Sequence, residues 1–142
     1  MDATTPNVPA ATLLIVDDEP LITQILSLQM TKQGFHTLVA ASAMEALKII
    51  DAAEMPIDLV ITDMSMPEMD GADLARALFA RSLALPVLIA SGYPADHAVA
   101  LPSNVVGVIE KPFQCKALAE RIRRILETGP SDRAHCNCRE AS

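Results

Sequence analysis

Residues 57–71 read IDLVITDMSMPEMDG, and this stretch decides the fold. Its apolar half predicts a short strand at residues 59–62 that is buried on both faces and that leads directly to the carboxylate of Asp63. The Met-Pro and Asp-Gly pairs that follow predict a turn into a helix. Because ligands of open α/β sheets bind in the crevice outside the carboxyl ends of the strands, an acid here is well placed for chemistry. We therefore predict that Asp63 is the chemical centre of the protein.

A similar strand, turn and helix opens the folded part of the chain. Leu13–Val16 is a short apolar run followed by Asp17-Asp18-Glu19-Pro20, which is typical of a buried strand that ends in a turn. Pro20 suits the first turn of a helix, where its missing N–H has no partner, and Gly34 is expected to end that helix. The apolar stripe that we expect to face the core consists of Leu21, Ile25 and Leu28, with Ile22 and Leu26 beside it.

The rest of the chain continues the alternation. Strands are predicted at residues 35–40, 86–90 and 105–109, and helices after Ser42, after Asp70, between Pro94 and Leu101, and around Leu118, Ile122, Ile125 and Leu126. Five strands alternating with five helices imply a parallel sheet with helices on both faces. The periodicity leaves the strand order open between a Rossmann-like and a flavodoxin-like sheet. No Gly-x-Gly-x-x-Gly turn follows the first strand, so dinucleotide binding loses its main support.

Length and charge limit the classes to which the protein can belong. Its 142 residues fit one domain, which we place at residues 12–128 between a flexible N-terminal segment, 1–11, and a disordered tail, 129–142. The net charge of −7 argues against direct binding to nucleic acid or to an anionic membrane. No apolar run reaches the roughly 18 residues of a membrane span, and the N-terminus lacks the basic region of a signal peptide. We expect a soluble, cytoplasmic protein.

Polar side chains follow several of the predicted strands. Asp17 and Asp18 follow the first strand, Asp63 the third, Ser91 the fourth, and Lys111 comes shortly after the fifth. Because the carboxyl ends of parallel strands share one edge of a sheet, these side chains are expected to converge. Three carboxylates repel one another unless a cation neutralises them, and carboxylates with water are the ligands that Mg²⁺ prefers. The sequence therefore predicts an acidic Mg²⁺ site.

The order of these motifs resembles the receiver domain of two-component response regulators. The resemblance covers about residues 12–128, and it is carried by Val16-Asp17-Asp18-Glu19-Pro20, Thr62 to Gly71, Ser91-Gly92 and Glu110-Lys111-Pro112-Phe113. It implies a flavodoxin-like (βα)5 fold, a doubly wound parallel sheet of five strands in the order 2-1-3-4-5. It also implies an aspartate that accepts a phosphoryl group from a histidine kinase or a histidine phosphotransfer protein.

The resemblance assigns a role to each residue of the predicted site. Asp63 corresponds to the phosphoacceptor, and Lys111 to the lysine that pairs with the phosphoryl group. Asp17 and Asp18 correspond to the residues that hold Mg²⁺ together with Asp63, and the backbone carbonyl of Ser65 is expected to complete the protein ligands. Ser91 corresponds to the hydroxyl that moves to hydrogen-bond the phosphoryl group. The bond between Lys111 and Pro112 is expected to be cis.

Two positions depart from the family pattern. Receiver domains often carry Tyr or Phe three residues before the lysine as a conformational switch, and Val108 stands there in this chain. Tyr93, two residues after Ser91, is our substitute candidate for that switch. Phosphatases with an aspartyl-phosphate intermediate usually place a second aspartate two residues after the nucleophile, and this chain has Ser65.

These departures rank the possible functions. The favoured function is a signalling module switched by phosphorylation, which catalyses its own modification and is not a turnover enzyme. An aspartyl-phosphate phosphatase and a non-phosphorylated, receiver-like scaffold remain as alternatives. Residues 129–142 are too few for a DNA-binding unit. The downstream partner is expected to be a protein whose identity the sequence does not indicate.

Overall fold

The computed structural model describes residues 10–52, 56–81, 85–92 and 101–127. Several predictions fall outside these ranges. The tail at 129–142 and the switch candidate Tyr93 lie wholly outside them. The N-terminal segment at 1–11 and the short helix between Pro94 and Leu101 lie outside them except for residues 10, 11 and 101.

Five parallel strands form one sheet, in the order β2-β1-β3-β4-β5. The strands are β1 (Thr12–Val16), β2 (His36–Ala40), β3 (Leu59–Asp63), β4 (Val87–Ser91) and β5 (Val105–Glu110). The described helices are α1 (Pro20–Lys32), α2 (Ala43–Ala52), α3 (Gly71–Ala80) and a last helix at residues 115–127. The predicted flavodoxin-like, doubly wound sheet is confirmed, and its strand order settles the choice that periodicity left open.

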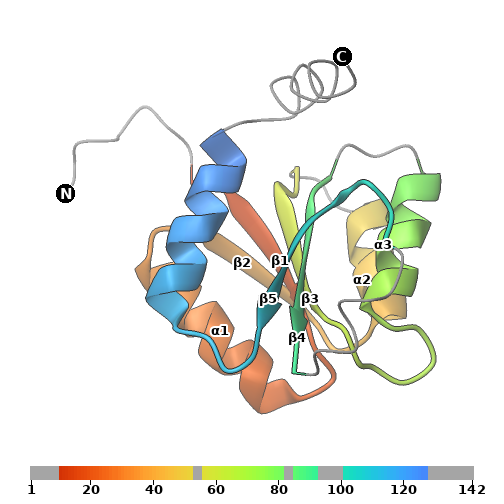
Figure 1. Ribbon diagram of the computed structural model, residues 1–142, viewed down its shortest axis with the longest axis horizontal. Coiled ribbons are helices and arrows are strands. Elements are labelled where there is room, and N and C mark those ends of the chain that lie inside the picture. Colours follow the sequence, from red (N-terminus) through yellow and green to blue (C-terminus); the bar gives the residue numbers. More distant parts are fainter. Residues whose placement is uncertain (1–9, 53–55, 82–84, 93–100, 128–142) are drawn as a thin grey trace.

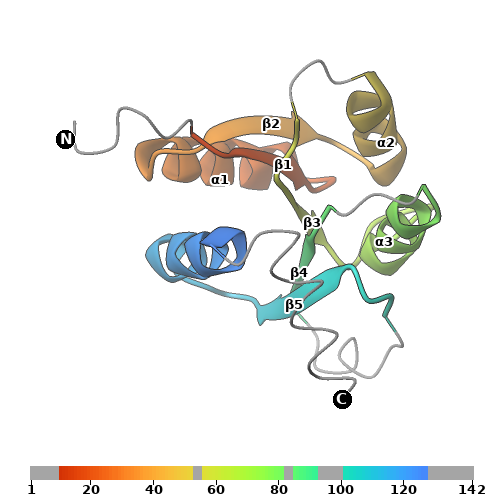
Figure 2. The ribbon, with the colours of Figure 1, turned by 90° about the horizontal axis from the view of Figure 1, so that it is seen from above.

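The helices cover both faces of the sheet (Figures 1 and 2). α1 and the last helix lie on one face, and α2 and α3 lie on the other. Alternate residues of β1 follow this division: Leu13 and Ile15 pack with α1 and the last helix, whereas Leu14 and Val16 pack with α2 and α3. β1 is therefore buried on both sides, as its continuous apolar run predicts. No helix among the described residues is long and apolar enough to cross a membrane.

Side chains that begin and end the helices explain several of the observed boundaries. α1 stops at Lys32, and Gly34 follows it with a φ of +100°, a conformation that favours glycine. Before α2, the Ser42 hydroxyl accepts a hydrogen bond from the Glu45 N–H at 3.1 Å. The Glu45 carboxylate accepts a hydrogen bond from the backbone N–H of Ala41. In a capping box it would accept this bond from the N–H of Ser42, one residue later.

The predicted core stripe of α1 is wrong for its three central residues, whereas Leu26 is buried and Ile22 packs against the core. Leu21, Ile25 and Leu28 are 65%, 46% and 57% exposed. The buried residues of this helix are Thr23, Leu26 and Met30.

The misassignment has a physical cause in the composition of α1. Apolar residues span more than half of the circumference of the helix, from Leu21 and Ile25 round to Leu26 and Met30, so their spacing does not show which part of this span faces the core. The contact with β2 helps to fix the rotation of the helix, because the Ser27 and Thr37 hydroxyls lie 2.7 Å apart. In that orientation Leu26 and Met30 point into the core, and Leu21, Ile25 and Leu28 are left toward solvent.

Candidate functional site

The register of the sheet brings the ends of its central strands together. Val16 of β1 pairs with Thr62 of β3, so the next residues, Asp17 and Asp63, lie side by side. Asp63 in turn pairs with Ala90 of β4. Ser91 therefore lies one residue beyond Asp63 along this edge.

β5 completes the edge. Ser91 pairs with Glu110, and the Lys111 N–H donates a hydrogen bond to the Ser91 carbonyl at 2.8 Å. The convergence that the sequence predicts is therefore a consequence of strand register, and the bond between Lys111 and Pro112 is cis, as expected.

Asp17 is the most deeply buried acid of this edge. The residue is 4% exposed, and its Oδ1 accepts a hydrogen bond from the Glu19 N–H at 2.9 Å. Burial raises the pKa of Asp17 above its ordinary value of 3.8, and the charges of Asp63 and Asp18 raise it further. The bond from Glu19 and the charge of Lys111 act in the opposite direction without cancelling the rise. The ionised form of Asp17 is thus destabilised by burial and by the neighbouring carboxylates, and a bound cation would stabilise it.

Lys111 supplies a positive charge to this site. Its Nζ donates a hydrogen bond to Oδ1 of Asp63 at 2.9 Å and lies 3.7 Å from Oδ2 of Asp17. Partial burial lowers the pKa of Lys111, but the hydrogen bond and charge of Asp63, followed by the charges of Asp17 and Glu19, raise it above its ordinary value of 10.5. The side chain is therefore an ammonium ion at neutral pH.

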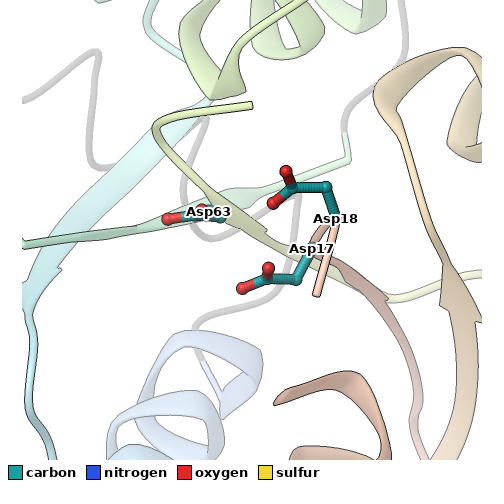
Figure 3. Close-up of side chains that lie close together, drawn as sticks. All are labelled: Asp17, Asp18 and Asp63. Atoms are coloured by element: carbon teal, nitrogen blue, oxygen red, sulfur yellow. The ribbon is translucent and has the colours of Figure 1, made fainter. Parts of the chain in front are cut away.

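Asp17, Asp18 and Asp63 form a group that could hold a metal ion (Figure 3). One carboxylate oxygen from each lies within 4.8 Å of the others, and the three side chains come from the ends of β1 and β3. Oxygens on opposite sides of an octahedral Mg²⁺ are about 4.2 Å apart, since each lies about 2.1 Å from the ion. Oxygens on adjacent sides are closer, at about 3.0 Å, so a closing movement of the three carboxylates would be needed for all of them to bind one ion. The donor set of hard carboxylate oxygens also fits a divalent cation.

The comparison with known protein families agrees with this geometry. Residues 13–123 match the family described as the response regulator receiver domain. The chain belongs to this receiver domain family. Its curated relatives include sensor kinases and response regulators of two-component systems. This receiver domain is therefore a two-component signalling module, and the phosphatase alternative is not favoured.

One curated relative illustrates how the receiver domain relates to longer proteins. The sensor kinase CckA of Brucella abortus is 35% identical to this chain over 120 residues, which is 83% of the chain and 13% of the kinase. The receiver domain thus corresponds to a small part of that relative.

Solved structures resemble the receiver domain over nearly their whole length. A response regulator receiver domain protein from Clostridium thermocellum has a TM-score of 0.76 and 30% identity, covering 82% of this chain and 94% of that one. The response regulator TrrA of Thermotoga maritima, solved in complex with Mg²⁺ and BeF, has a TM-score of 0.74 and 25% identity, covering 82% of this chain and 99% of that one.

Other predicted residues of the receiver domain lie close to this edge. Ser91 ends β4 and is fully buried. Ser65 is exposed in the loop after β3, and its role as a carbonyl ligand stays a prediction. Val108 of β5 packs against the core on the α2 and α3 side of the sheet, where its side chain is partly buried. The aromatic switch position of the family is therefore filled by a small aliphatic residue of the core.

Gly71 supports the receiver site in a way that the sequence reading missed. A Cβ atom at this position would lie 2.6 Å from the backbone oxygen of Asp63 and 3.1 Å from the Cα of Met64. Gly71 also donates its N–H to the Met64 carbonyl at 2.9 Å. The first turn of α3 is thus in direct contact with the backbone that carries Asp63. A glycine at the first position of a helix, where other residues serve better, was the available signal.

Glu19 was also missed. It lies between the two predicted metal-binding acids and Pro20, and sequence reasoning treated it only as part of a turn. Its charge contributes to the raised pKa of Lys111, and its N–H donates the hydrogen bond to Asp17.

Proposed function

We propose that Asp63 is the residue on which this receiver domain is phosphorylated, with a histidine kinase or a histidine phosphotransfer protein as the donor. The observation that carries the proposal is the contact between Asp63 and the Lys111 ammonium at 2.9 Å, beside the carboxylates of Asp17 and Asp18. The site joins a carboxylate nucleophile to a fixed positive charge and to a set of metal ligands. Phosphoryl transfer needs this combination, because its catalysis is mostly positioning and charge neutralisation.

The transfer step exchanges one bond to phosphorus for another. An oxygen of Asp63 forms a bond to the phosphorus of phosphohistidine while the bond between that phosphorus and the imidazole nitrogen breaks. The nitrogen keeps the electron pair and takes up a proton, which leaves neutral histidine on the donor and an acyl phosphate on Asp63. Attack by water on the acyl phosphate later returns Asp63 and inorganic phosphate.

Lys111 is proposed to pair with the Asp63 carboxylate before the transfer and with the phosphoryl oxygens after it. In the unmodified protein its ammonium group pairs with Asp63. After transfer, the same group is within reach of the phosphoryl oxygens that Asp63 then carries. Its raised pKa keeps it charged throughout. Ser91 follows Ala90, the residue of β4 that pairs with Asp63. We propose that its hydroxyl turns toward the phosphoryl group.

Mg²⁺ is the proposed cofactor. Asp17, Asp18 and Asp63 would hold it, with the backbone carbonyl of Ser65 as a further ligand. When bound, the ion neutralises the phosphoryl oxygens in the transition state. The raised pKa of Asp17 supports this assignment, because burial and, after it, the charges of Asp63 and Asp18 disfavour the ionised carboxylate, and a bound cation would stabilise it.

The proposed activity is that of a switch and not of a turnover enzyme. Ser65 stands two residues after Asp63, where a phosphatase would need a carboxyl group to act as a general acid. A serine hydroxyl does not supply that acid at neutral pH. The acyl phosphate is therefore expected to persist long enough to change the surface that a downstream protein recognises.

A mass measurement tests this proposal. The protein is incubated with MgCl₂ and either acetyl phosphate or phosphoramidate, and the intact mass is measured against time. We expect one added phosphoryl group that is absent in Asp63→Asn and is lost at alkaline pH. Asp51→Asn, which changes an exposed acid on α2, is the matched control and should accept the group normally. Continuous release of phosphate with many phosphoesters would instead indicate a phosphatase, and the absence of any adduct would indicate a scaffold.

A further inference from the structure

β2 lies at one margin of the sheet, where β1 is the strand that it pairs with (Figure 2). The His36 N–H donates a hydrogen bond to the Ala11 carbonyl at 2.8 Å, and the Ala40 carbonyl accepts one from the Asp17 N–H at 3.2 Å. In a parallel pair, every second residue of a strand bonds to the same neighbour. The backbone groups of residues 36, 38 and 40 therefore point toward β1.

The backbone groups of Thr37 and Val39 point the other way, to the outside of the sheet. The next outward positions on either side already have partners. The Phe35 N–H donates to a carbonyl in the last turn of α1 at 3.1 Å, and the Ala41 N–H donates to the Glu45 carboxylate at 2.6 Å. No described residue bonds to the outward N–H and C=O groups of Thr37 and Val39. These groups form a short open edge.

The side chains of this edge do not protect it. Natural proteins usually shield an open strand edge with charged side chains, proline or a bulge. β2 has the sequence HTLVA, which contains no Pro and no Lys, Arg, Asp or Glu. Leu38 and Val39 are 38% and 44% exposed, and they lie on opposite faces of the strand. The edge thus combines unpaired backbone groups with exposed apolar side chains.

We propose that β2 pairs with β2 of a second copy of this chain, antiparallel and about a two-fold axis at Leu38. The contact joins two five-stranded sheets into one continuous sheet. Thr37 of each copy lies opposite Val39 of the other, and each such pair exchanges two hydrogen bonds. Every outward backbone group of both edges then has a partner. This inference does not rest on the proposed function of Asp63.

The register follows from which groups are open. A two-fold axis at Thr37 would place Val39 opposite Phe35, whose N–H is already bonded to α1. An axis at Val39 would place Thr37 opposite Ala41, whose N–H is already bonded to a carboxylate. An axis at Leu38 uses only the open groups. The edge is therefore complementary to itself, which favours a second copy over an extended segment of another protein.

The side chains and the charge distribution fit the same arrangement. Leu38 meets Leu38 of the second copy as a pair without backbone hydrogen bonds, in which side chains approach closely. Val39 meets Thr37, a cross-strand pair of β-branched residues. Both exposed apolar side chains are covered in this way. Residues 20–44 contain no Asp or Glu although the chain has a net charge of −7, so α1 and β2 of the two copies meet without acidic groups of their own.

Sedimentation equilibrium of the purified chain, from micromolar to millimolar concentration, tests the proposal. Because the edge is short, we expect a weak dimer with a dissociation constant on the order of 100 μM. Leu38→Lys should raise this constant about tenfold or more, since it places like charges opposite each other at the axis. Val39→Pro should do the same, because it removes an outward N–H while leaving the bonds to β1 intact.

A matched variant controls for the change in charge. Phe79→Lys makes the same change at a side chain of α3 that is 52% exposed, and it should leave the dissociation constant unchanged. Urea unfolding curves check that each variant is folded.

Two further measurements test the register. Leu38→Lys and Leu38→Glu, each monomeric alone, should form a mixed dimer when combined, because opposite charges then meet at the axis. Hydrogen exchange at the Thr37 and Val39 amides should slow as protein concentration rises. Exchange at the Leu38 and Ala40 amides, which face β1, should not change with concentration.

Four results would overturn the dimer proposal. The first is a chain that stays monomeric at millimolar concentration. The second is a dimer that Leu38→Lys and Val39→Pro leave intact. The third is the absence of a mixed dimer between folded Leu38→Lys and Leu38→Glu. The fourth is slow exchange at the Thr37 and Val39 amides in a monomer, which would show that another segment of the same chain covers the edge.

Discussion

The Lys111 ammonium lies 2.9 Å from Oδ1 of Asp63 and 3.7 Å from Oδ2 of Asp17. In the absence of metal, this lysine is the positive charge that partly neutralises the acidic cluster. A bound divalent cation would act on the same carboxylates. The lysine and the metal are therefore coupled through Asp63 and Asp17, and removing one should change the effect of the other.

Lys111→Met should strengthen Mg²⁺ binding several-fold. The three carboxylates lose a neighbouring positive charge, so they attract the ion more strongly. The same change should lower the free energy of unfolding of the metal-free protein by about 1–2 kcal/mol, because it leaves a partly buried cluster of like charges. Titration calorimetry measures the affinity, and urea unfolding in EDTA measures the stability. Lys116→Met, on the exposed side of the last helix, is the control. Equal Mg²⁺ affinities for the Lys111 variant and the unmodified chain would contradict the coupling.

Asp17→Asn should stabilise the metal-free protein, and increasingly so as pH rises. Burial and the neighbouring charges of Asp63 and Asp18 raise the pKa of Asp17 above 3.8 in the folded state. The folded protein then binds this proton more tightly than the unfolded chain does. Ionisation of Asp17 therefore costs stability above pH 3.8, and the cost grows until the pH has passed the folded pKa.

Urea unfolding in EDTA at several pH values measures this effect. The midpoints of Asp17→Asn and the unmodified chain should be similar below pH 3.8 and should separate as pH rises toward 7. Millimolar Mg²⁺ should reverse the order, because the unmodified chain, with all three carboxylates, binds the ion more tightly and gains more stability from it than the variant does. A variant that is less stable than the unmodified chain at pH 7 in EDTA would show that the hydrogen bond from Glu19 outweighs the repulsion.

Particular residues show what the sequence could and could not predict. The strands were predictable because β1, β3 and β4 are short, continuous apolar runs, a pattern typical of a sheet covered on both faces. The convergence of Asp17, Asp18 and Asp63 was predictable from the strands, because the carboxyl ends of parallel strands lie at the same edge of a sheet. The face of α1 was not predictable, because its apolar residues span more than half of the helix circumference and its orientation depends on contacts with distant residues such as Thr37. The role of Gly71 also depends on a tertiary contact, its approach to the backbone of Asp63.

Asp70→Ala should lower the free energy of unfolding by about 1 kcal/mol. Asp70 precedes α3, and its Oδ1 accepts a hydrogen bond from the Asp73 N–H at 2.8 Å, while Oδ2 of Asp73 accepts one from the Asp70 N–H at 3.2 Å. The change removes the acceptor of the Asp73 N–H, whereas the backbone N–H of residue 70 keeps the Asp73 carboxylate as its partner. Asp51→Ala, which removes an exposed ion pair with Arg81, is the control and should have a smaller effect. Equal shifts in urea unfolding for the two variants would show that the cap contributes no more than a surface ion pair.

Gly71→Ala should disturb both the stability and the chemistry of the protein. The added methyl group would meet the backbone oxygen of Asp63 at 2.6 Å, and this oxygen belongs to a central strand that has little freedom to move. We expect a loss of about 1–3 kcal/mol in the free energy of unfolding. The remaining folded protein should react more slowly with acetyl phosphate, because the strand end that carries Asp63 or the first turn of α3 has to shift.

Gly92→Ala is the matched control for that substitution. Gly92 follows Ser91 at the same edge of the sheet, but a Cβ atom there would meet no atom of the described residues within 4 Å. It should therefore unfold at nearly the same urea concentration as the unmodified chain. If Gly71→Ala were as stable as Gly92→Ala and equally reactive, α3 could move away from β3 without cost. The close contact between Gly71 and Asp63 would then not be what positions the phosphoacceptor.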